Sequence, residues 1–176
     1  MPRDLNHPVW EVYDLLRTAR LNSKYYSGRI ARLQRQQFWL DALVAAAASG
    51  SALASLPIWS TSFGRPAWQA FAIPAAVASV VKPSLNLSKR IRALEEVATA
   101  YRVFEAELRG IELTIRTRKA YDPVTRTHFE HLLGRLKELA LKPAEAKEDT
   151  KLKRRCQEEV KRELPSTHFF VPEEGK

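Results

Sequence analysis

The sequence predicts an all-α fold, in which a two-helix transmembrane hairpin carries long amphipathic cytoplasmic helices that form a bundle. Three observations lead to this prediction. Two long uncharged runs lie close together in the chain. Charged residues crowd residues 1–41 and the part after Val81, with only Arg65 between them. Apolar residues on both sides of the runs recur at helical spacing.

Four parts are expected along the chain. Residues 1–37 form an N-terminal cytoplasmic amphipathic helix, and residues 38–83 form the hairpin, with spans at about 40–60 and 66–83. Residues 84–142 form a cytoplasmic helical region, and residues 143–176 form a charged helix and tail.

The N-terminal helix has a recognisable start and a helical stripe. Asn6-His7-Pro8 is typical of a helix start, with proline in the first turn. The apolar series that follows keeps helical spacing up to the first uncharged run: Val12, Leu15 or Leu16, Ala19, Tyr26, Ile30 and Leu33. We therefore expect one helix that continues into the first span with little interruption.

The two uncharged runs differ in length. Ala42 to Gly64 gives 23 positions, more than the roughly 20 that cross a bilayer. Pro66 to Val81 gives only 16, so the second span needs the stem of Lys82, whose ammonium group would snorkel to the headgroups. The first run begins some 40 residues into the chain, so we expect no signal peptide and insertion by the hydrophobic helices themselves.

Aromatic and basic residues predict the orientation. Trp39, Trp59, Trp68 and Lys82 fall at span ends, where amphipathic side chains meet the membrane interface. Seven Arg and Lys residues precede the first run, whereas the connecting turn has one. The positive-inside rule then places both termini in the cytoplasm, at the bacterial inner (cytoplasmic) membrane. The alternative is a soluble helical bundle with a buried alanine-rich hairpin.

Small residues recur at every fourth position in both runs, a spacing that lets helix backbones approach closely in lipid. They are Ala42, Ala46, Gly50 and Ala54 in the first run and Ala70, Pro74 and Ala78 in the second. This packing would occur within one hairpin or between subunits of a homo-oligomer, or the spacing reflects only the alanine content. Pro74 would kink its helix. Asp41 is either an interfacial carboxylate or part of a ring at a pore mouth.

The segment after the second run carries a heptad-like apolar seam that slips in phase. Its members are Leu87, Ile91, Leu94, Val97, Tyr101, Phe104, Leu108, Ile111 and Ile115. The slip lies between Leu94 and Val97, because holding the first register would put Glu105 and Glu112 in the seam. A drifting stripe of this kind suits a bundle, and we expect it to pack against the N-terminal helix.

The rest of the chain is more polar. A further helix should begin at Asp122-Pro123 and run toward Pro143. Residues 144–164 are mostly charged and indicate a solvated helix or a disordered arm, with Cys156 as an exposed free thiol. The aromatic pair Phe169-Phe170 would dock on a partner or on the chain's own bundle.

No motif for a cofactor, a metal ion or a nucleophile–base pair is visible, so we expect neither a cofactor nor enzymatic activity. The basic stretches lack aromatic residues for base stacking, so nucleic acid is not an expected partner. One short match is the exception. Arg126 and His131 fit R-x4-H, the catalytic signature of HEPN-type ribonucleases, in which histidine acts as acid or base.

Several segments together resemble the SLATT group, the two-transmembrane effectors of bacterial nucleotide-signalling defence systems. They are Leu21-Asn-Ser-Lys-Tyr-Tyr26, Arg29-Ile-Ala-Arg-Leu-Gln-Arg35, Val81-Lys-Pro-Ser-Leu85 and the helix from Ile91 to Tyr101. The resemblance covers roughly residues 10–120 and rests on architecture.

The resemblance implies a membrane effector of antiviral defence that oligomerises and perforates or depolarises the inner membrane. A sensor protein or a nucleotide signal would supply the trigger. The R-x4-H match is similar to a motif of the small membrane accessory proteins of RNA-targeting CRISPR systems. A helical membrane scaffold without effector activity is a third hypothesis.

Overall fold

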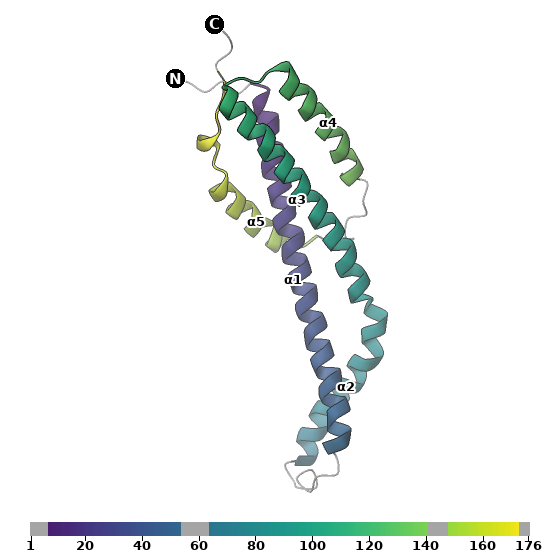
Figure 1. Cartoon of the computed structure of the whole chain (residues 1–176). Helices are drawn as coiled ribbons and strands as arrows, with labels where there is room; N and C mark the ends of the chain where they lie inside the picture. The colour runs from purple at the N-terminus through teal and green to yellow at the C-terminus, as the bar shows by residue number, and fades with distance from the viewer. Residues whose placement is uncertain (1–6, 54–63, 141–147, 173–176) are drawn as a thin grey trace. The chain divides into compact units, whose positions relative to one another are not determined.

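The structure is a computed structural model that describes residues 7–53, 64–140 and 148–172 (Figure 1). Within these ranges it is all-α, as predicted, with five α-helices and a short 3-10 turn. They are α1 (Val9–Leu53), α2 (Gly64–Leu85), α3 (Leu87–Arg118), α4 (Pro123–Ala140), α5 (Thr150–Glu163) and η2 (Ser166–His168). The predicted continuity of the N-terminal helix into the first uncharged run is confirmed as far as Leu53.

The chain divides into two compact units. The first comprises Met1–Gly28 and Leu94–Lys176 and is called the bundle below. The second comprises Arg29–Ala93 and is called the hairpin. Helices α1 and α3 therefore contribute residues to both units.

Side-chain caps explain where three helices begin. The backbone N–H of Val9 donates to Nδ1 of His7 over 3.2 Å at the start of α1. Asp122 accepts from the N–H of Thr125 over 2.7 Å, and Asp149 accepts from the N–H of Leu152 over 2.9 Å. Each acceptor satisfies one of the N–H groups that a first helical turn leaves without a partner. The predicted helix start at Asp122-Pro123 is thus confirmed.

Helices α1, α3 and α4 share the buried core of the bundle. Val12 and Leu16 of α1 lie in one cluster with Leu108 and Ile111 of α3. The whole cluster consists of Val9, Val12, Tyr13, Leu16, Ala19, Phe104, Leu108, Ile111, Ile115, Phe129, Leu132 and Phe169. This confirms the expected packing of the N-terminal helix against the apolar seam of α3. In Figure 1, α4 and α5 lie on opposite sides of the α1–α3 pair in this unit.

The predicted phase slip in α3 is wrong in one respect. Ala98 is completely buried and Glu105 is only 6% exposed, so the first register continues alongside the second. Glu105 is tolerated there because Oε1 accepts from Nη2 of Arg109 over 3.0 Å and lies 3.4 Å from Nη1 of Arg20. A buried carboxylate is costly only without such partners. The buried stripe of α3 is therefore wider than a single heptad seam.

Helix α5 has a buried face, which corrects the expectation of an exposed thiol. Leu152, Cys156 and Val160 are buried and recur at every fourth residue, so they share one side of the helix. Leu152 and Cys156 pack against Tyr25 of α1. Cys156 is 5% exposed, and burial raises the pKa of its thiol. The sequence missed this face because three apolar residues in a strongly charged segment are a weak signal.

Ion pairs fix the outer side of α5 to α1. Nζ of Lys24 lies 2.6 Å from a carboxylate oxygen of Glu163 and 3.1 Å from one of Glu159. Nε of Arg20 lies 3.0 Å from the other oxygen of Glu163. The hydrogen bond to Glu163 raises the pKa of Lys24, and the same bond lowers the pKa of Glu163.

The tail that follows α5 docks on the chain's own bundle, one of the two predicted alternatives. Phe169 stacks on Tyr13 with ring centroids 4.0 Å apart. The Tyr13 hydroxyl donates to the carbonyl of Phe170 over 2.6 Å, and the Arg17 guanidinium donates twice to the carbonyl of Leu164, over 2.9 and 2.8 Å. Burial raises the pKa of Tyr13 to about 12.

Candidate functional site

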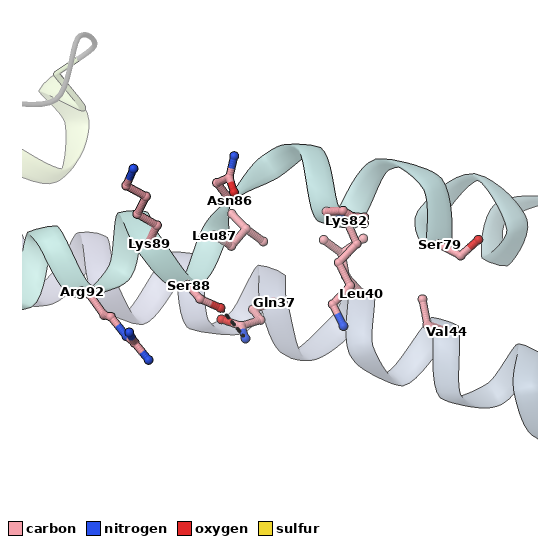
Figure 2. Close-up of a pocket in the computed structure, with 11 residues that line it drawn as sticks. Gln37, Leu40, Val44, Ser79, Lys82, Asn86, Leu87, Ser88, Lys89 and Arg92 are labelled. Carbon is pink, nitrogen blue, oxygen red and sulfur yellow. Dashed lines mark hydrogen bonds between the residues drawn. The ribbon is translucent and has the colours of Figure 1, made fainter.

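The hairpin pairs α1 with α2 and with the first turn of α3. Nζ of Lys82 lies 2.5 Å from Oδ1 of Asp41. Four residues earlier in α1, Nε2 of Gln37 donates to the hydroxyl of Ser88 over 3.5 Å, as Figure 2 shows. Residue numbers fall from Asp41 to Gln37 along α1 while they rise from Lys82 in α2 to Ser88 in α3. The two helical segments therefore run antiparallel. The inward side chains are small or aliphatic: Ile30, Leu33, Ala78, Leu87 and Ile91 are buried.

The Asp41–Lys82 pair gives each charge a partner that the sequence did not predict. Both side chains remain over 40% exposed, at 44% and 42%, so the pair is not enclosed by protein. The sequence alone predicts that Lys82 reaches the headgroups by its length and that Asp41 is an interfacial or pore-mouth carboxylate. In the structure the two neutralise each other, which reduces the energy needed to place either near an apolar medium.

The outer face of α2 carries an exposed aliphatic stripe. Ile73, Val77 and Val80 are 65%, 57% and 75% exposed. Their spacing of four and three residues places them on one side of the helix. On α1, Phe38 and Trp39 are also largely exposed. Large apolar side chains exposed on a helix face are typical of sites that contact a membrane or another protein.

No helix within the described ranges is both long enough and apolar enough to cross a membrane. The last part of the first predicted span, from Ala54 and including Trp59, lies outside those ranges. Trp68 belongs to α2, but its side chain is not among those described.

The predicted packing residues fall into two groups. Ala78 is buried inside the hairpin, whereas Ala46, Ala70 and Pro74 are exposed. Ala42 is half-buried, and the surroundings of Gly50 are not described. Residues that share the four-residue spacing therefore do not all lie in the contact between α1 and α2 of one chain.

The boundary between α2 and α3 is set by an asparagine, not by a proline. Helix α2 continues through both Pro74 and Pro83 to Leu85. Asn86 then has a φ of 46°, in the left-handed region, which asparagine adopts more readily than most residues. Its carbonyl accepts the N–H of Arg90 over 3.1 Å and so begins α3. The pair Leu85-Asn86 was the available sequence signal for this break.

The R-x4-H residues are both exposed on α4. Nε of Arg126 lies 4.0 Å from Glu130 within the same helix, and His131 is exposed. Five residues on a helix correspond to a rotation of about 140°, so the two side chains leave the helix in different directions. Within one chain they do not converge on a common point.

A cavity of about 680 Å³ lies in the hairpin, and sequence reasoning did not anticipate it. It is formed where α1, the end of α2 and the start of α3 meet around the break at Asn86 (Figure 2). Its lining residues are Gln37, Leu40, Val44, Ser79, Lys82, Pro83, Asn86, Leu87, Ser88, Lys89 and Arg92. Asn86 signals the break in the sequence, but no local pattern specifies which residues of α1 lie opposite that break.

The chain matches no protein-family model, no curated protein and no solved structure.

Proposed function

We propose that the chain is an oligomeric effector of the bacterial inner membrane that forms or gates a pore in antiphage defence. A partner protein or a nucleotide signal would trigger it, and both termini would lie in the cytoplasm. The observation that carries the proposal is the exposed aliphatic stripe of Ile73, Val77 and Val80. In water such a stripe is unfavourable by roughly 25 cal/mol for each Å² of apolar surface, whereas lipid or a neighbouring subunit would cover it.

The distribution of charge supports a membrane location. Lys82, the cation nearest the stripe, is paired with Asp41. Beyond it, Lys89, Arg90 and Arg92 follow in the first turns of α3, on the side expected to face the cytoplasm. Exposed Trp39 fits the position of an interfacial aromatic residue.

The exposed small residues support an oligomer. Ala78 is buried inside the hairpin, whereas Ala46 and Ala70 are exposed on its surface. In lipid, where apolar burial gives no advantage, close backbone approach at such residues is a main source of helix association. A second copy of the hairpin would make that approach.

A carbonate wash of bacterial membranes tests the membrane location. The wild-type chain should stay in the pellet, and Ile73→Lys with Val80→Lys should move it to the supernatant. The matched control is Val124→Lys, which charges an apolar residue on α4 that is 71% exposed and should leave the chain in the pellet. Release of the wild-type chain would contradict the proposal.

Disulfide cross-linking tests the oligomer. In a Cys156→Ser background, Ala70→Cys should give covalent dimers in membranes, whereas Ala78→Cys, buried inside the hairpin, should not. The detergent-solubilised particle should have the mass of several chains. A strictly monomeric mass without cross-links would contradict a pore.

The ribonuclease alternative makes a separate prediction. RNA fragmentation on expression that Arg126→Ala and His131→Ala each abolish would favour it, whereas loss of membrane potential that survives both substitutions favours the pore. A scaffold would give neither effect.

A further inference from the structure

The side of α3 that faces away from the core of the bundle carries a second regular seam, called the outer seam below. Its members are uncharged and exposed, and they follow one another at alternating steps of four and three residues. They are Thr99, Val103, Ala106, Gly110, Leu113 and Thr117. Such steps keep residues on one face of a helix, as in a coiled coil. Every charged residue between positions 99 and 117 lies elsewhere on α3, so this face of a highly charged helix has no charge of its own.

The outer seam combines two large apolar side chains with two small residues between them. Val103 is 45% exposed and Leu113 is 64% exposed. Between them lie Ala106 and Gly110, and a Cβ at Gly110 would meet nothing within 4 Å. A second helix could therefore approach closely at the middle of the seam and cover the two aliphatic side chains.

The charges along the two edges of the outer seam select the orientation of such a helix. One edge carries a basic residue at every seventh position: Arg102, Arg109 and Arg116. The other edge carries one carboxylate and no cation: Ala100, Glu107 and Thr114. An antiparallel second α3 would place the two arginine edges against each other. A parallel second α3 would place each arginine edge against the edge that contains the carboxylate, and edge charges of this kind set partner choice in coiled coils.

We propose that the outer seam binds the outer seam of a second copy of the chain, so that the two α3 helices form a short parallel coiled coil. Each seam residue would then lie opposite its own counterpart. Arg102 of each copy would lie beside Glu107 of the other, which gives two ion pairs for one contact. The inference deepens the proposed function and rests on it, because two copies inserted in one membrane with the same orientation hold their α3 helices parallel.

The existing contacts of the two charged residues leave room for this pairing. Arg102 is exposed and donates to the hydroxyl of Ser27 over 3.3 Å. The side chain of Glu107 is 31% exposed and pairs with Arg135 of α4. Because exposed ion pairs contribute little free energy, these pairs would set the orientation, and the apolar side chains would supply most of the attraction.

The length of the outer seam limits the strength of the contact. Its 19 residues extend over about 27 Å of helix, which is short for a coiled coil. Confinement to one membrane would raise the effective concentration of the two copies and so favour their association.

Disulfide cross-linking of the full chain in membranes tests the contact. In a Cys156→Ser background, Leu113→Cys should form linked dimers at least about tenfold faster than Val124→Cys, because the coiled coil holds the two thiols together. Val124 is the matched control, since it is an aliphatic residue of α4 that is 71% exposed. Val103→Cys should also form linked dimers, since each seam residue faces its counterpart. Faster linkage between Val103→Cys and Leu113→Cys chains than within either variant would indicate an antiparallel contact and overturn the proposal.

A second set of variants tests the seam by its charge. Added to Val103→Cys, Leu113→Lys should slow cross-linking at least about tenfold, because two ammonium groups would replace an apolar pair. Val124→Lys should slow it less than twofold. Both residues are exposed in one chain, so neither variant should unfold the bundle, which circular dichroism checks. If Leu113→Lys has no effect, or if Val124→Lys has an equal one, the outer seam is not an interface.

The edge charges give a third measurement. Arg102→Glu would oppose Glu107 of the other copy and should slow cross-linking of Val103→Cys about threefold, as expected for exposed charges. Arg102→Lys keeps the charge and should cross-link as the parent does. Faster cross-linking of Arg102→Glu would contradict the parallel orientation.

The outer seam and the proposed function fail in different ways. A chain that carbonate extracts, but that still links through Leu113→Cys, would refute the membrane function and leave the outer seam standing. A chain that stays in the membrane and links through Ala70→Cys, but not through Leu113→Cys, would refute the outer seam alone.

Discussion

The ring of Phe169 lies nearly parallel to the ring of Tyr13, with an interplanar angle of 13° and 4.0 Å between centroids. The two residues are near opposite ends of the chain, so this stack closes the bundle by joining the tail to the first turns of α1. Arg17 strengthens the contact, since its guanidinium carbon lies 5.1 Å from the centroid of the Phe169 ring.

The first prediction concerns this stack. Phe169→Ala should lower the free energy of unfolding by about 3 kcal/mol, because it leaves a cavity among buried side chains. Thermal unfolding followed by circular dichroism should show a fall in Tm of roughly 10 °C. The control is His168→Ala, an exposed neighbour that should change Tm little. Equal effects of the two substitutions would show that the stack contributes nothing specific.

The second prediction concerns pH. The pKa of Glu163 is lowered by Lys24, so its contribution to stability is present above the unfolded value of about 4.5 and is lost as pH falls through the folded value. The pKa of Lys24 is raised, so its contribution is present below about 10.5 and is lost as pH rises through the folded value. Between these limits the pair should be fully formed.

Glu163→Gln should remove this acid-side dependence while costing no more than about 1 kcal/mol at neutral pH, because the Glu163 side chain is 41% exposed and water screens its charge. Denaturant unfolding at a series of pH values measures both effects. The matched control is Glu158→Gln, which changes a carboxylate that pairs within α5 and does not reach α1. If the two variants have the same pH profile, the Lys24–Glu163 bond does not stabilise the docked helix.

The third prediction concerns Cys156. Its burial and raised pKa should make it react with a thiol reagent at pH 8 at least tenfold more slowly than an exposed cysteine, because the thiolate is the reactive species. The comparison is Cys156→Ser with Gln157→Cys, which moves the thiol by one residue to an exposed position. Equal labelling rates would mean that α5 does not stay docked on α1.

The fourth prediction concerns three glycines in helices. Alanine is favoured over glycine by about 0.5–1 kcal/mol in a helix interior, and a Cβ at Gly110 or Gly134 would meet nothing within 4 Å. Gly110→Ala and Gly134→Ala should therefore each stabilise the bundle by that amount. At Gly28 a Cβ would lie 3.2 Å from both terminal methyl groups of Leu152, so Gly28→Ala should gain less or destabilise.

Denaturant midpoints of the three variants provide the measurement. A gain at Gly28 as large as at Gly110 would show that Leu152 moves freely and that the contact between α5 and α1 is loose.

The fifth prediction concerns the hairpin pair. Lys82→Asp places two carboxylates together and should reduce the amount of chain that carbonate leaves in the membrane. The double substitution Asp41→Lys with Lys82→Asp restores opposite charges and should recover most of it. If the double variant behaves like the single one, the ion pair does not support the hairpin.

Local signals predicted where most of the helices lie. Asp122 before a proline predicted the start of α4, and the apolar residues at helical spacing in α1 and α3 predicted that these two helices pack together. Both predictions were possible because helix caps and the 3.6-residue period depend on a few neighbouring residues. For α5, the sequence left a solvated helix and a disordered arm as alternatives, and it did not predict that one face of the helix is buried. The buried face of α5 consists of Leu152, Cys156 and Val160, which stand in a charged segment. Their burial depends on α1, which covers them only in the folded structure.

The candidate sites divide in the same way. Charge asymmetry and the uncharged runs led to the hairpin from sequence alone, whereas the outward stripe of Ile73, Val77 and Val80 could be separated from buried Ala78 only in three dimensions. Glu105 shows the limit most clearly. In the sequence, a carboxylate at this position predicts that the position is exposed. In the structure, Glu105 is buried because Arg20 and Arg109 form ion pairs with it.

The sequence by itself determined that this protein is helical, where its charge lies and where most of its helices begin, since these depend on short-range periodicity and capping. Tertiary structure alone decided which polar groups have partners, how the tail closes the bundle and where a cavity forms beside Asn86. Those features depend on side chains that are distant in the chain, and their free energies exist only once the helices have packed.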